Sequence, residues 1–207
     1  MNFLLKDTFI QLVSKYNSDP DLIDTLWTEI DRQYSNAERY YHNLDHLNNM
    51  LIQLNDLLSQ MNNPDSILFA LYYHDIIYKT SQFDNEAQSA KLAIERMKAI
   101  GLPALLIETC SSQIMATKSH EWTENGDANY FTDADLSILG SPQEQYQKYL
   151  EAIRKEYAIY SDLVYKTGRR KVINHFLEMP RIFKTDHFHH KFEKQARHNL
   201  QIELSVF

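Results

Sequence analysis

Apolar side chains recur at every third or fourth position along most of this chain, a spacing typical of helices with one buried face. The clearest case begins at Asp19, which is placed as an N-cap, with Pro20 at the first helical position. Five apolar residues then fall on one face: Leu22, Ile23, Leu26, Trp27 and Ile30. No segment alternates with a period of two for long enough to predict a strand.

Further helices follow the same spacing, and a few residues mark their ends. Gly101 and Gly140 are expected to end two of them, while Ser141 and Glu144 have the spacing of a capping box that starts the next. The polar stretch 120–129 is the clearest loop. The remaining predicted helices span 44–61, 63–78, 84–100, 103–117, 130–140, 141–165, 168–179 and 191–204. With no repeat, linker or shift in composition, they predict an all-α fold, a single-domain helical bundle over residues 1–207.

Composition fits a helical domain with a substantial core, because 43% of the 207 residues are hydrophobic. The net charge of −7 argues against nucleic acid or an anionic membrane as the main partner. No apolar run reaches 18 residues and the N-terminus does not resemble a signal peptide, so a cytoplasmic protein is expected. The single cysteine, Cys110, excludes an intramolecular disulfide and fits a helical core position.

Two short stretches, "RYYHNLDHL" and "ALYYHDIIY", place imidazole and carboxylate groups among apolar residues. His42 and His46 are four positions apart and share a face if their stretch is helical. His74 and Asp75 are adjacent, and Asp135 lies in a later apolar helix, where a buried carboxylate needs a partner. Two nitrogen and two oxygen donors from separate helices can form a metal centre inside a bundle. The predicted ligands of a Mn, Fe, Co, Ni, Zn or Mg ion are therefore His46, His74, Asp75 and Asp135.

Each of these residues, taken alone, has a more ordinary explanation. A single histidine such as His46 is more often a hydrogen-bonded core residue, and Asp135 alone is more often a cap or an ion-pair partner. The ordered set, a histidine, then His-Asp, then an aspartate on a later apolar helix, favours the metal site.

This order resembles the HD-domain superfamily of metal-dependent phosphohydrolases, over a core of about 35–140. More closely, the stretches "HDIIY" and "DNEAQSA", followed by "FTDADLSILG", resemble a group of small bacterial predicted HD phosphohydrolases without an assigned substrate. The stretch "YHNLDH" is similar to the His-Asn-x-x-His signature of cyclic-nucleotide phosphodiesterases. The resemblance implies that His42 is the general acid and that His46 is a metal ligand. The sequence departs from the phosphodiesterases at Tyr78, where they carry a further histidine, so the resemblance does not imply a cyclic nucleotide. The substrate stays open among a nucleotide, a cyclic or linear phosphodiester and a small phosphomonoester.

Other polar residues have weaker claims to the same site. His120 stands where many HD proteins supply a histidine to a second metal or to a phosphate, although an exposed loop histidine is an equal alternative. Glu86 could orient the attacking water as a catalytic residue, although acids are also favoured in a first helical turn. A phosphoester needs cations as well, and the candidates are Arg39, Lys118, Arg169 and Arg170.

The expected function is metal-assisted hydrolysis of a small phosphoester, with a nucleotide favoured as substrate. A bound metal would lower the pKa of water from about 15.7 towards neutrality, and His42 would donate a proton to the leaving oxygen. Two alternatives stay open, a non-catalytic module that binds a metal or nucleotide and a di-iron oxygenase on the same scaffold. The sequence does not indicate an oligomeric state.

Overall fold

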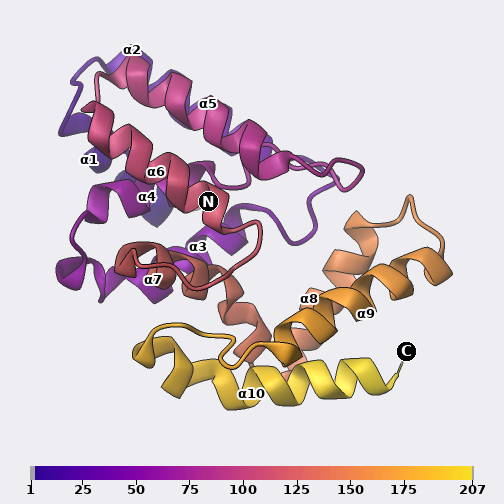
Figure 1. Ribbon diagram of the computed structural model, residues 1–207. Coiled ribbons are helices and arrows are strands. Elements are labelled where there is room, and N and C mark those ends of the chain that lie inside the picture. The colour runs from indigo at the N-terminus through magenta and orange to yellow at the C-terminus, as the bar shows by residue number, and fades with distance from the viewer. Residues whose placement is uncertain (1–2, 207) are drawn as a thin grey trace. The chain divides into compact units, whose positions relative to one another are not determined.

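A computed structural model describes residues 3–206, and every regular element in that range is helical (Figure 1). The predicted all-α fold is therefore confirmed. The chain divides into two compact units, Met1–Thr132 and Asp133–Phe207. The single-domain organisation over 1–207 stays a prediction. Across the described chain, no helix has both the length and the apolar character needed to cross a membrane.

The first unit is organised around α4, which is buried on all sides. Every residue of this helix from Ser66 to Tyr73 is buried, as expected for a helix that is apolar around its whole circumference. It packs against α1, α3, α5 and α6. The elements that begin in this unit are α1 (Phe3–Ser14), α2 (Pro20–Tyr34), α3 (Leu44–Asn55), η1 (Leu58–Gln60), α4 (Pro64–Tyr73), α5 (Asn85–Ile100), α6 (Ala104–Ala116) and α7 (Gly126–Asp135).

Local capping explains where several of these helices begin and end. The Asp19 carboxylate accepts hydrogen bonds from two backbone amides at the start of α2, and Pro20 occupies the first position, as predicted. Asn63 caps α4 by accepting from the Ser66 amide. Gly101 ends α5 in the left-handed region with φ of 90°, which a residue with a Cβ rarely adopts.

Several predicted boundaries are wrong. The helices expected over 168–179 and 191–204 begin earlier, at Asp162 and Asp186, and the loop expected over 120–129 is shorter because α7 begins at Gly126. The helix expected over 44–61 ends at Asn55, and a short 3-10 turn follows. The helix expected over 63–78 ends at Tyr73. His74 is its C-cap and keeps helical backbone angles (φ −60°, ψ −40°), and Asp75 follows in a turn. The Ser141 capping box does not form, because α8 begins after Pro142, and the buried Ser141 Oγ finds no hydrogen-bond partner among the described residues.

The second unit consists of η2 (Leu136–Gly140), α8 (Gln143–Glu156), α9 (Asp162–Glu178) and α10 (Asp186–Ser205). The helix expected over 141–165 is therefore two helices with a break at 157–161. A buried ion pair joins α9 to α10, since the Arg169 guanidinium donates to both carboxylate oxygens of Glu203 at 2.7 and 3.0 Å. Arg169 is thus buried and paired with Glu203 inside this unit, and its role as a substrate cation stays a prediction.

Candidate metal centre

The N-terminus of α3 fixes the position of His46. The Asn43 side chain accepts hydrogen bonds from the backbone amides of Asp45 and His46 at 2.9 and 3.3 Å, so it is the N-cap of α3. His46 then lies in the first helical turn with only 3% of its surface exposed. The cap was not recognised from sequence, although an asparagine just before a run of helical spacing is a usual signal for one.

The end of α4 fixes the position and the tautomer of His74. This residue is the C-cap of the buried helix and is 1% exposed. Its Nδ1 lies 3.0 Å from the Leu71 carbonyl oxygen, which can only accept, so Nδ1 carries the proton. When the ring is neutral, it therefore presents the lone pair of Nε2, the arrangement used by histidines that bind metals.

His46, His74 and Asp75 bring three donor atoms together within 4.8 Å of one another. The two Nε2 atoms of His46 and His74 are 3.2 Å apart, and His74 Nε2 lies 3.2 Å from Asp75 Oδ2. Two donors at about 2.1 Å from one ion stand roughly 3.0 Å apart at a right angle and roughly 3.4 Å apart at the tetrahedral angle. The observed spacing thus fits neighbouring ligands of a single ion.

The close approach of the two Nε2 atoms has a second explanation. When the His74 ring is neutral with its proton on Nδ1, His46 Nε2–H can donate to His74 Nε2 as an ordinary hydrogen bond. A cation bound between the rings would replace that proton, as in any site whose ligands lose a proton to the metal. The geometry is therefore compatible with both a buried histidine pair and a metal site.

His42 stands beside this group and is not on a helix. The expectation that it shares a helical face with His46 is wrong, because α3 begins only at Leu44. The rings of His42 and His46 are nevertheless 5.8 Å apart, and His42 Nε2 lies 4.0 Å from Asp75 Oδ2. With 18% of its side chain exposed, His42 is more accessible to solvent than the other two histidines.

Aromatic side chains form the walls around these imidazoles. Tyr78 stacks on His42 with ring centroids 4.1 Å apart and 28° between the ring planes. Tyr41 contacts the rings of both His42 and His46, and Phe131 meets His74 edge-on at 5.7 Å. Apolar spacing indicates buried rings at such positions, but it does not indicate that they pack against histidines.

The other predicted site residues lie outside the three-donor group. Glu86 is half-buried in the first turn of α5, and Lys118 is exposed just after α6. His120 follows α6 with φ of 54°, a left-handed conformation, and its amide donates to the Ala116 carbonyl. Asp135 is half-buried at the end of α7 and belongs to the second unit. The roles assigned to these four residues stay predictions.

Arg39 is half-buried, and its guanidinium donates three hydrogen bonds to backbone carbonyls of the site segments. The contact of Arg39 with a substrate phosphate stays a prediction. Tyr34, which sequence reasoning did not select, accepts a hydrogen bond from the Asp75 amide at 3.2 Å. Its place on the apolar stripe of α2 predicts burial, but nothing in the sequence indicates a role for the hydroxyl.

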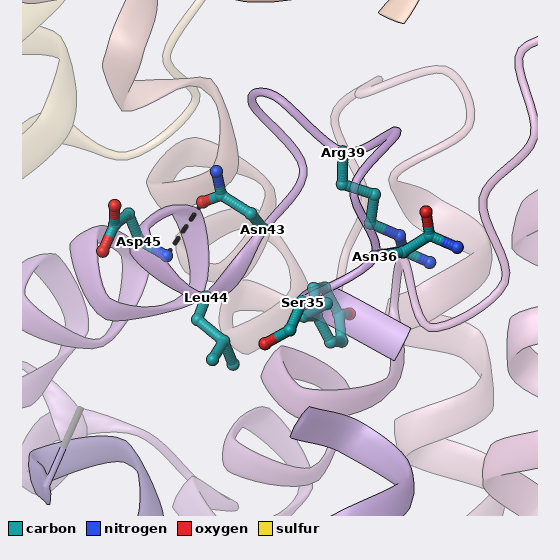
Figure 2. A pocket seen from close by; sticks show the side chains of 7 residues that line it. Ser35, Asn36, Arg39, Asn43, Leu44 and Asp45 are labelled. Atoms are coloured by element: carbon teal, nitrogen blue, oxygen red, sulfur yellow. Dashed lines mark hydrogen bonds between the residues drawn. The ribbon is translucent and has the colours of Figure 1, made fainter. Parts of the chain in front are cut away.

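An open pocket of about 270 Å³ lies beside Arg39 and the N-terminus of α3. Figure 2 shows Arg39 and Asn36 at one end of it and Asn43 and Asp45 at the other. Its lining is Tyr34, Ser35, Asn36, Arg39, Asn43, Leu44 and Asp45. Because none of the three donor residues lines it, this pocket is not the metal cavity.

No family model, no curated protein and no solved structure matched this chain when it was compared with each of them. Membership of the HD-domain superfamily therefore stays a prediction, and the candidate metal centre rests on the geometry of its own residues.

Proposed function

We propose that this protein is a phosphohydrolase that works with a divalent metal ion held by His46, His74 and Asp75, with Asp135 as the predicted fourth ligand. One observation carries the proposal. The buried Nε2 atoms of His46 and His74 are 3.2 Å apart, and His74 Nε2 lies 3.2 Å from the Asp75 carboxylate. The sequence resemblance to HD-domain phosphohydrolases supports the same class of reaction.

The residues of the chain divide into those that hold the ion and one that handles a proton. A divalent ion, when bound, supplies a Lewis acid that lowers the pKa of a coordinated water from about 15.7 to near 7. His74 offers Nε2 because its Nδ1 proton is committed to Leu71. His42 lies outside the donor group and keeps access to solvent, so its Nε2 can carry a proton to the leaving oxygen of the ester.

The proposed substrate is a small-molecule phosphoester, with a nucleotide as the first choice, and the proposed location is the cytoplasm. The net charge of −7 disfavours a long polyanion such as nucleic acid as substrate. A small phosphoester needs only a local site, which the three donors and the neighbouring His42 supply.

The test is phosphate or nucleoside release from a panel of phosphoesters. Metal-stripped protein is reloaded separately with Mn, Co, Ni, Mg and Zn, and metal content is measured alongside turnover. Asp75→Asn removes a ligand charge without changing side-chain size. Asp45→Asn is the matched control, because Asp45 is an exposed carboxylate next to His46 that belongs to no predicted ligand set.

We expect turnover that requires metal, falls by orders of magnitude in Asp75→Asn and persists in Asp45→Asn. Metal bound without release from any ester would overturn the hydrolase and favour a binding module or an oxygenase. Protein that binds none of the five metals would overturn the metal centre itself.

A further inference from the structure

Arg39 joins the two segments that carry the candidate site. Its Nη1 donates to the Asp75 carbonyl at 2.7 Å and to the His42 carbonyl at 3.2 Å, and its Nη2 donates to the Ile76 carbonyl at 2.9 Å. Three of the five guanidinium N–H groups are thus used on main-chain oxygens. One planar group fixes the turn after α4 to the bend before α3.

Two of the carbonyls that Arg39 binds, those of Asp75 and Ile76, lie beyond the C-terminus of α4. Asp75 and Ile76 follow the last residue of α4, so their carbonyls accept no bond within that helix. A cation is also favoured at a helix C-terminus by the peptide dipoles. The guanidinium fork can bind several carbonyls in fixed directions, which a lysine ammonium does not do.

Tyr34 completes the attachment of Asp75. Its hydroxyl accepts from the Asp75 amide at 3.2 Å, while its ring lies 4.7 Å from Arg39 Cζ. The amide and the carbonyl of Asp75 are therefore both held, the first by Tyr34 and the second by Arg39. Tyr78, whose ring lies 5.7 Å from Arg39 Cζ, stacks in turn on His42.

We infer that Arg39 is a positioning residue of the metal centre, which acts through the backbones of Asp75 and His42 and is supported by Tyr34. The inference rests on the proposed function. It gives Arg39 a role other than the substrate contact expected from sequence. Misplacing a catalytic group by about 1 Å can cost on the order of a hundredfold in rate, so a clamp of this kind bears directly on the site.

Cobalt binding measures this role without requiring turnover. Apo-protein is titrated with Co²⁺ while the visible d–d absorption is recorded, and thermal unfolding is followed on the same samples. Arg39→Lys keeps the charge but loses the fork, and Tyr34→Phe keeps the ring but loses the acceptor for Asp75. Arg32→Lys is the matched control, because Arg32 is an exposed arginine near the end of α2.

We expect Arg39→Lys to weaken Co²⁺ binding about 10- to 100-fold and to alter the absorption bands, as substitutions behind metal ligands do. Tyr34→Phe should weaken Co²⁺ binding and alter the absorption bands to a smaller extent. Arg32→Lys should leave Co²⁺ affinity and absorption unchanged. Should a substrate ester be found, kcat in Arg39→Lys should fall more than KM rises.

Two results would overturn the inference. A folded Arg39→Lys protein with wild-type Co²⁺ affinity and absorption would show that Arg39 does not position the metal ligands and only stabilises the fold. If KM alone rose in that protein, Arg39 would instead contact the substrate phosphate. Wild-type protein that binds no Co²⁺ would overturn the inference together with the metal centre. Wild-type protein that binds Co²⁺ but hydrolyses nothing would overturn the hydrolase alone, and a weakened Arg39→Lys affinity would still support the positioning role.

Discussion

Replacing Gly140 by alanine tests how closely η2 and α10 approach within the second unit. A Cβ at this position would lie 2.5 Å from Phe192 Cβ, 2.8 Å from its carbonyl oxygen and 2.9 Å from its Cα. Favourable carbon–carbon contact begins at about 3.5 Å, so the overlap is roughly 1 Å. Two of the three atoms belong to the backbone of α10 and cannot rotate away. We expect Gly140→Ala to lower the free energy of unfolding by about 1–3 kcal/mol.

Gly168 supplies the matched control for this substitution. It is exposed in the middle of α9, and apart from its chain neighbours and the backbone of its own helix, no described atom lies within 4 Å of the position that its Cβ would take. Gly168→Ala should therefore raise the free energy of unfolding by about 0.5–1 kcal/mol through helix propensity alone. Urea unfolding followed by far-ultraviolet circular dichroism measures both effects. A Gly140→Ala protein as stable as the wild type would refute the close packing of η2 against α10.

Three further predictions concern single groups. Burial raises the pKa of the Cys110 thiol, so the native protein should not react with a disulfide reagent at pH 8, whereas urea-unfolded protein should react fully. Burial alone would raise the pKa of Glu193, but hydrogen bonds from the Phe183 and Ile182 amides and from Arg197 outweigh it and lower the pKa overall. Glu193 therefore contributes stability above the unfolded pKa of about 4.3, and that contribution is lost as the pH falls through the lower folded value. In thermal unfolding, Glu193→Gln should melt at a lower temperature than the wild type, and this difference should become smaller as the pH is lowered. A difference that does not depend on pH would contradict this assignment. His42→Gln should reduce turnover about 10²- to 10⁴-fold with unchanged Co²⁺ affinity, and weaker Co²⁺ binding would instead make His42 a ligand.

Helix positions could be predicted from sequence wherever the signal is local. Caps such as Asp19 and Asn63 act on amides two or three residues away, and Gly101 ends α5 by its own backbone freedom. The Ser141 prediction failed because Pro142, expected at the first helical position, is not helical (φ −53°, ψ 148°), so α8 begins at Gln143 and Ser141 lies one residue before the N-cap position. A local motif thus predicts a helix terminus only where the incoming chain has the geometry that the cap requires.

The candidate site was predicted in its residue types but not in its geometry. The sequence indicates that His46, His74 and Asp75 are unusual among apolar neighbours, and the structure brings their donor atoms together. The helix that was expected to continue to Tyr78 ends at Tyr73, with His74 as its C-cap, and Asp75 in the following turn places a carboxylate oxygen 3.2 Å from His74 Nε2. The contacts of Arg39 with carbonyls depend on how distant segments fold together, so no spacing in the sequence indicates them.

The enclosure of α4 has a consequence for how ligand binding would be sensed. Its residues are covered by four other helices, so its amides should exchange with solvent only when the whole first unit opens. An ion bound at His74 would therefore slow exchange throughout this core and not only near the ligands. At a metal concentration one hundred times Kd, the protection should rise by about 2.7 kcal/mol. Occupancy of a small site would in this way be reported by the slowest-exchanging amides of the protein.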